Sequence, residues 1–82
     1  MSLEQVFEVM EDLQEDTTVS KNIRNKISLM QSELKDCRQD RLSLTINKIL
    51  SDLEDLSSDV NIPPFVRTQF WHISSLLESW ED

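Results

Sequence analysis

Sixteen of the 82 residues are acidic, and eight of these fall in two clusters at corresponding places in the two halves of the chain. The clusters are Glu11, Asp12, Glu15 and Asp16, and Asp52, Glu54, Asp55 and Asp59. Neighbouring carboxylates can bind a hard cation, and calcium takes about six to eight oxygen ligands. The chain has no glycine and no loop of alternating Asp and Asn ligands. We therefore interpret the clusters as solvated faces, with docking onto a basic partner and metal or small-molecule binding as alternatives.

The single cysteine, Cys37, and the single histidine, His72, are the other residues with chemical potential. A thiol and an imidazole act together only where the base lies within hydrogen-bond reach of the nucleophile. No motif orients His72, and no oxyanion donors are signalled. A lone cysteine also gives no disulfide framework and no zinc site. We expect no enzyme, no catalytic residue, no metal site and no cofactor.

Four polar residues recur in pairs, Asp16 with Arg24 and Asp59 with Arg67. One interpretation is a pair of quasi-symmetric binding positions. The other is structural, with each Asp at the end of a helix, accepting hydrogen bonds from the amides that begin the next helix or from the Arg. We favour the structural interpretation, because a connector that occurs twice has to be fixed twice.

Apolar residues spaced three and four apart predict four amphipathic helices. Their stripes are Leu3, Val6, Phe7, Met10, Leu13; Ile23, Ile27, Met30, Leu34, Cys37; Leu42, Ile46, Ile49, Leu53, Leu56; and Val66, Phe70, Ile73, Leu77, Trp80. Ser2 with Gln5 has the spacing of a capping box for the first helix. Ser20 is the expected N-cap of the second helix and Asp40 that of the third. Pro64 suits the first turn of the fourth.

The two halves of the chain match when one is slid by 43 residues. Identical pairs include Glu11 and Glu54, Asp12 and Asp55, Leu13 and Leu56, Asp16 and Asp59, Arg24 and Arg67, Ser32 and Ser75, and Leu34 and Leu77. Val19 meets Ile62 within the connector. We predict an all-α single domain, residues 1–82, made of two tandem helical hairpins that arose by internal duplication. Repeat one spans about 2–37 and repeat two about 41–80. The period suits a HEAT-like helix pair, and a four-helix bundle is equally compatible.

The net charge of −8 and the isoelectric point near 4.4 disfavour a nucleic-acid partner, because such binding draws its affinity from cations that neutralise phosphates. Only Lys35, Arg38 and Arg41 lie at helical spacing among the basic residues. A basic protein partner is electrostatically favoured. The first turns carry acids, so we expect no signal peptide, no membrane span and a cytoplasmic protein.

Several apolar residues lie off the four stripes. Wide burial in a multi-helix fold is one explanation, and a second apolar surface for another chain is the other. The candidate interface residues are Phe65, Trp71, Leu76 and Leu44. We predict a non-enzymatic protein–protein interaction module or small adaptor that self-associates, with a dimer as the expected form. The alternative function is metal or small-molecule binding through the acidic clusters.

Two sequence segments, Asn22–Lys26 and Asn61–Ser79, resemble the archaeal uncharacterised protein family 0147, a group of short acidic proteins. The resemblance rests on Asn22, Ile23 and Arg24 in the first hairpin and on Pro63, Arg67, Thr68, Trp71, Leu77 and Glu78 in the second. It covers about Glu11 to Trp80, and Ser20 departs from it where a proline is expected. The resemblance implies an all-helical fold and an archaeal cytoplasm, and it implies no function.

Overall fold

Four helices make up the part of the chain that the structure describes, as the apolar stripes predict. The computed structural model describes residues 3–79. Helix α1 runs over Glu4–Glu15, α2 over Lys21–Asp36, α3 over Leu42–Ser57 and α4 over Pro64–Glu78. A short 3₁₀ turn, η1 (Gln39–Arg41), precedes α3. Within residues 3–79 there is no strand, so the all-α prediction is confirmed.

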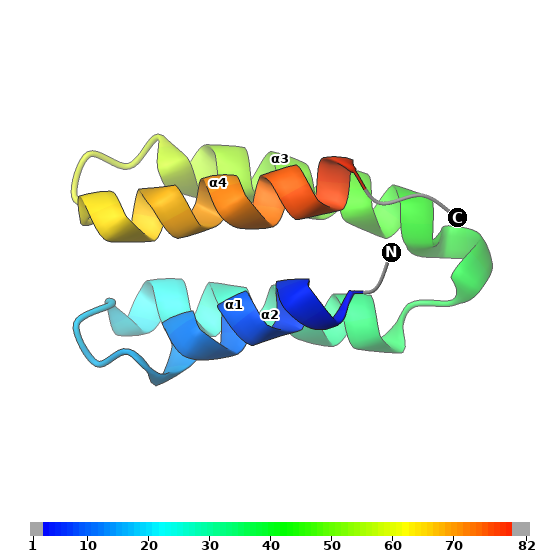
Figure 1. Ribbon diagram of the computed structural model, residues 1–82, viewed down its shortest axis with the longest axis horizontal. Helices are drawn as coiled ribbons and strands as arrows, with labels where there is room; N and C mark the ends of the chain where they lie inside the picture. Colours follow the sequence, from blue (N-terminus) through cyan, green and yellow to red (C-terminus); the bar gives the residue numbers. More distant parts are fainter. Residues whose placement is uncertain (1–2, 80–82) are drawn as a thin grey trace.

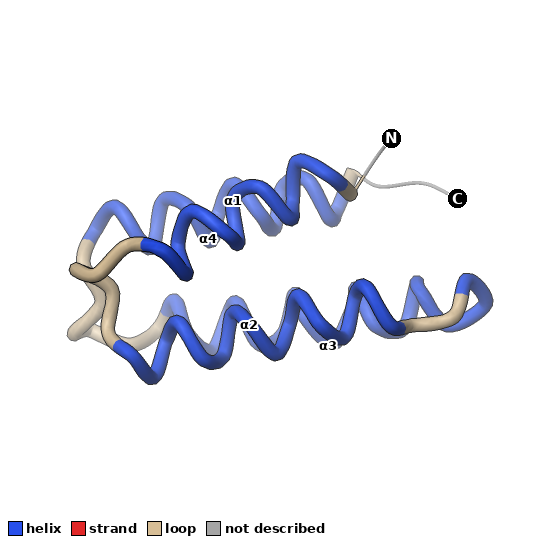
Figure 2. Tube along the Cα trace, turned by 90° about the horizontal axis from the view of Figure 1, so that it is seen from below, coloured by secondary structure: helices blue, strands red, loops and turns tan. Residues whose placement is uncertain are grey.

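The helices run up and down as an antiparallel bundle about 35 Å long (Figure 1). Helix α1 packs against α2 and α4, and α3 packs against the same two helices, whereas the diagonal pairs make no close backbone contact in the described part of the chain. Figure 2 shows α1 and α4 together on one side and α2 and α3 on the other. Hairpins stacked by translation, as in a HEAT-like pair, would place α1 beside α3. Of the two predicted arrangements, the four-helix bundle is the one that forms.

The core is a single cluster of apolar side chains between the four helices. It takes up three or more residues of every predicted stripe, and it also includes the connector residues Val19 and Ile62. Its buried members are Val6, Met10, Leu13, Val19, Ile23, Ile27, Met30, Leu34, Leu42, Ile46, Ile49, Leu53, Ile62, Val66, Phe70, Ile73 and Leu77. The stripe residues Leu3, Phe7, Cys37 and Leu56 are only half-buried, against its edge. Trp80, also predicted for the core, lies outside the described residues.

The helix starts confirm the predicted cap Ser20 and the predicted place of Pro64, and they correct the predicted cap Asp40. Ser20 accepts a hydrogen bond from the Ile23 amide, 3.3 Å from Oγ, and Pro64 occupies the first turn of α4. Asp40 does not cap α3, because it lies within η1, before the helix start, and Arg41 is the cap residue. The Asp40 carboxylate lies 3.8 Å from Arg38 Nε instead. The capping box proposed at Ser2 involves a residue outside the described ones.

Candidate interaction surfaces

The two aspartates of the duplicated pattern, Asp16 and Asp59, accept hydrogen bonds from residues of their own connectors. Asp16 Oδ1 accepts from the Thr18 amide at 2.9 Å and from Thr18 Oγ1 at 2.6 Å. Asp59 Oδ1 accepts from the Asn61 amide at 2.9 Å, which is the same contact 43 residues later. The expected partners, the amides of the following helix or the arginine, are therefore replaced by groups inside the connector. Hydrogen bonds from Thr18 lower the pKa of Asp16, and the positive charge of Arg24 lowers it further.

The two arginines differ in what they contact. Arg67 Nε donates to the Ser57 carbonyl at 3.2 Å, and its Nη2 donates to the Asp59 carbonyl at 3.3 Å. Arg67 thus ties the start of α4 to the last turn of α3 and the connector behind it. Arg24 Nε is buried and finds no hydrogen-bond partner within residues 3–79. Neither arginine forms an ion pair with its aspartate in the described part of the chain.

A chain of polar side chains crosses between α1 and α2. Gln31 is the one buried polar residue among those described, 7% exposed. Its Oε1 accepts from Gln14 Nε2 at 2.6 Å, and its Nε2 donates to Glu11 Oε1 at 3.1 Å. Gln14 Nε2 also donates to the Met10 carbonyl at 3.2 Å. These contacts supply hydrogen-bond partners for the side-chain amides of Gln14 and Gln31 where α1 and α2 meet.

The thiol and the imidazole are not brought together. Cys37 follows the end of α2 and lies 3.4 Å from the Leu34 carbonyl, its hydrogen-bond acceptor. His72 lies exposed on α4, and α4 is not a neighbour of α2 in the bundle. Among the described residues, no three His, Cys, Asp or Glu side chains converge as they would at a metal centre.

Three of the four candidate interface residues lie on α4. Trp71 is 62% exposed and Phe65 is 43% exposed, while Leu76 is half-buried against the core. By helical geometry, at about 100° per residue, Trp71 lies on the flank that bears Arg67, and so towards α3, and Phe65 and Leu76 on the opposite flank. The outer surface between these flanks carries Thr68, His72 and Ser75. The exposed surface of α4 is therefore wide, partly aromatic and largely uncharged.

The fourth candidate, Leu44, lies elsewhere. It is 66% exposed in the first turn of α3, at the end of the bundle opposite the start of α4 (Figure 1). Sequence reasoning passed over Val60, which is exposed in the α3–α4 connector. The four candidates therefore do not form one continuous patch.

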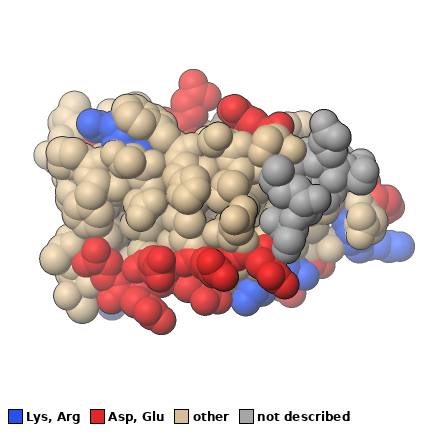
Figure 3. Space-filling model, viewed as in Figure 1, with Lys and Arg blue, Asp and Glu red and all other residues tan. Residues whose placement is uncertain are grey.

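Acidic side chains border the uncharged surface, most densely along α1. Helix α1 exposes all of its acids, namely Glu4, Glu8, Glu11, Asp12 and Glu15. Figure 3 shows a band of acidic atoms along the edge where α1 runs, further acidic atoms at the opposite edge, and a broad area without charge between them. Within α4 only Arg67 and Glu78 are charged, and the Arg67 guanidinium is engaged with backbone carbonyls.

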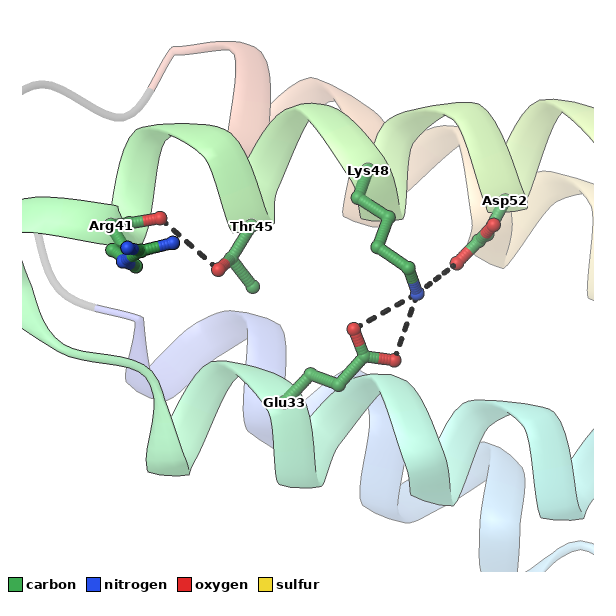
Figure 4. Close-up of polar contacts among 5 residues, drawn as sticks. All are labelled: Glu33, Arg41, Thr45, Lys48 and Asp52. Atoms are coloured by element: carbon green, nitrogen blue, oxygen red, sulfur yellow. Dashed lines mark hydrogen bonds and ion pairs between the residues drawn. The ribbon is translucent and has the colours of Figure 1, made fainter.

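The opposite side of the bundle carries a groove between α2 and α3, with a volume of about 390 Å³. Lys48 of α3 reaches across it, with Nζ 2.9 and 3.1 Å from the two carboxylate oxygens of Glu33 on α2 and 3.3 Å from Asp52 Oδ2 (Figure 4). The hydrogen bond to Glu33 raises the pKa of Lys48, and Asp52 adds to this effect. The residues that line the groove are Lys26, Leu29, Met30, Glu33, Lys48, Asp52, Asp55, Leu56 and Asp59.

The three basic residues at helical spacing do not form an open phosphate-binding row. The Lys35 ammonium lies 5.4 Å from the centre of the Phe7 ring, a cation–π contact between α2 and α1. Arg38 lies beside the Asp40 carboxylate. Arg41 is exposed at the start of α3.

Comparison with known proteins gives the family. The model of the Uncharacterised protein family (UPF0147) matches residues 1–80. The chain belongs to this family. A UPF0147 protein of Archaeoglobus fulgidus is 38% identical over 76 residues, which are 93% of this chain and 85% of the relative. A UPF0147 protein of Methanosarcina mazei is 34% identical over 77 residues, 94% of this chain and 82% of the relative.

A solved structure in this comparison has the same fold. The crystal structure of the unknown-function protein MMP1188 superimposes with a TM-score of 0.86 at 34% sequence identity. The match covers 98% of this chain and 90% of that one. Resemblance to an archaeal family of all-helical proteins is thus confirmed. Among the described residues, no helix combines the length and the apolar character needed to cross a membrane.

Proposed function

We propose that this UPF0147 protein is a non-enzymatic protein–protein interaction module of the cytoplasm, and that the outer surface of α4 is its first contact surface. The observation that carries the proposal is the exposure of Trp71 and Phe65 on a helix that is almost free of charge. Aromatic side chains are favoured as anchors at protein interfaces, where a fully desolvated ring contributes much of the binding energy. Isolated exposed leucines need no such explanation.

A second copy of the chain is the occupant that this surface suits. The protein carries a net charge of −8, so two copies repel each other over most of their surfaces. The outer surface of α4 contributes almost nothing to that repulsion. The acids of α1 lie along its edge, where an interface normally has its polar rim. A dimer formed through α4 therefore buries the aromatic rings and leaves the acids in water.

The size of the surface sets the strength of the dimer. Fifteen helical residues span roughly 22 Å, and a helix is about 10 Å wide. The area that the outer surface of α4 can bury is therefore well below the ~800 Å² per partner of a standard interface. The flanks of α1 and α3 add to this area. We therefore expect a dissociable dimer.

Sedimentation equilibrium tests this proposal on three forms of the full chain. The wild type is expected to show a reversible monomer–dimer equilibrium, and Trp71→Glu is expected to weaken it at least about ten-fold, which corresponds to about 1.4 kcal/mol. Leu44→Glu is the matched control, because it places the same charge at an equally exposed apolar position away from α4. A wild type that stays monomeric at millimolar concentration, or equal losses in both variants, would refute the proposal.

A further inference from the structure

The groove between α2 and α3 lies on the opposite side of the bundle from the paired helices α1 and α4 (Figure 2). Its volume is about 390 Å³. We propose that this groove binds a cationic amphipathic helix of a partner protein. The proposal deepens the interaction function proposed above, but it concerns a different surface and does not require the protein to dimerise.

The floor and one rim of the groove are apolar. Met30 is buried and Leu56 is half-buried against the core, so both present apolar atoms from below. Leu29 stands at the rim on α2 and is 64% exposed. The lining runs from Lys48 to Leu56 along α3, with Asp59 beyond it in the connector, and from Lys26 to Glu33 along α2. The eight helical steps of α3 from Lys48 to Leu56 amount to roughly 12 Å, a little over two turns. A helix lying lengthwise could place apolar residues of successive turns along this floor.

The α3 side of the groove is acidic. Asp52 and Asp55 of α3 and Asp59 of the connector that follows all line it. The whole lining has two basic residues, Lys26 and Lys48, against four carboxylates, and so carries a net charge of −2. An apolar floor beneath a carboxylate wall matches a helix that has leucines on one face and lysines or arginines on the other.

Lys48 is an example of an alkylammonium group bound by the carboxylates of the groove. Its Nζ is held between two carboxylates, one from each wall, at 2.9 and 3.3 Å (Figure 4). This occupies Glu33 and Asp52 near one end of the groove. Asp55, further along α3, forms no ion pair within the described residues. A lysine or arginine of the partner could form an ion pair with the Asp55 carboxylate, as Lys48 does with Asp52 one turn earlier.

The test uses the full chain and a synthetic probe. The probe is a capped peptide of roughly 16 residues that forms an amphipathic helix, with leucines on one face and lysines on the other. Binding is measured by fluorescence anisotropy at fixed ionic strength, since rim charges are screened by salt. We expect the probe to bind the wild type and a version with glutamates in place of the lysines not to bind.

Two neighbouring residues supply a matched pair of variants. Asp55→Lys reverses a charge inside the groove, and Glu54→Lys makes the same change on an exposed residue that is not part of the lining. We expect Asp55→Lys to weaken binding at least about ten-fold, and Glu54→Lys to change it by less than about two-fold. Leu29→Ser removes the apolar rim and is expected to weaken binding as well.

Three results would overturn the inference. They are absence of binding by the lysine probe, equal losses in Asp55→Lys and Glu54→Lys, and full displacement of the probe by an equal concentration of spermidine, which would identify a small polycation as the ligand. Trp71→Glu separates this inference from the proposed dimer. If Trp71→Glu loses dimerisation but binds the probe as the wild type does, the groove binds its partner independently of the dimer. If Asp55→Lys loses probe binding but still dimerises, the α4 surface acts independently of the groove.

Discussion

The hydrogen bond between Gln14 and Gln31 offers a direct test of how the first hairpin is held together. Gln31 is nearly fully buried, and its side-chain oxygen lies 2.6 Å from Gln14 Nε2. Its own amide nitrogen donates to Glu11 Oε1. The proposed perturbation is a cycle of Gln14→Ala, Gln31→Ala and the double variant. A cycle is needed because each single change also removes packing.

The expected magnitudes come from the two bonds that Gln31 makes. The neutral bond to Gln14 contributes about 1 kcal/mol. The bond to the Glu11 carboxylate is discounted to a similar value of about 1 kcal/mol, because Glu11 is exposed to water. Gln31→Ala should therefore lower the free energy of unfolding by roughly 2 kcal/mol, or the melting temperature by about 8–16 °C for a domain of this size. The coupling between Gln14 and Gln31 should be about 1 kcal/mol.

Urea denaturation followed by circular dichroism at pH 7 measures both quantities. Gln69→Ala is the control, because Gln69 is a half-buried glutamine on α4 outside these contacts, and its replacement should change stability by less than about 0.5 kcal/mol. A coupling energy indistinguishable from zero would refute the reasoning. It would mean that the two amides are equally well satisfied by water and do not join α1 to α2.

Three further predictions concern the caps, the connector and the core. Ser20→Ala should cost about 1 kcal/mol of unfolding free energy through loss of the N-cap, whereas Asp40→Ala should cost less than about 0.5 kcal/mol; equal losses in chemical denaturation would contradict the assigned caps. The lowered pKa of Asp16 means that its charge stabilises the fold above the ordinary aspartate pKa of about 3.9 and that this contribution is lost as the pH falls through the folded value. The stability gap between wild type and Asp16→Asn should accordingly be constant at neutral pH and shrink in acid, and a gap that widens in an acid urea series would count against the Thr18 contacts. Ile49→Ala should cost about 2–5 kcal/mol because it leaves a cavity in the core, while Leu44→Ala should leave the melting temperature nearly unchanged.

The fold was largely predictable because its helices carry a clear apolar period. Stripes at spacings of three and four identified all four helices, and Ser20 and Pro64 marked two of their starts. The internal duplication stays a prediction. It gains support from the matching contacts of Asp16 and Asp59 inside their connectors and from the burial of Val19 and Ile62.

Other features depend on how helices meet, which a periodic pattern does not contain. Gln31 is a polar residue that the sequence places beside the apolar stripe, four residues after Ile27, and only the approach of α1 buries it. At the corresponding positions of the second hairpin stand Ser57 and Ser74, so no repeat signal pointed to the glutamines. The 3₁₀ turn before α3 moved the helix start past Asp40, a shift smaller than sequence patterns can define.

The candidate surface was only partly predictable from the apolar period. Period alone placed Trp71 and Phe65 off the stripe, and both are exposed. It also grouped Leu44 with them, although Leu44 lies on α3 at the other end of the bundle. The groove between α2 and α3 was not foreseen, because it joins residues such as Lys26 and Asp55 from two separate helices.

The measurement that tests the central claim most directly is a dilution series of ¹H–¹⁵N spectra of the wild-type chain. If α4 is the contact surface between two copies, the amides of Thr68, Trp71, His72 and Ser75 should shift with concentration, together with the Trp71 indole. The amides of α2 should stay in place. Spectra that do not change with concentration, or shifts that fall on α2 and α3 instead, would contradict the account.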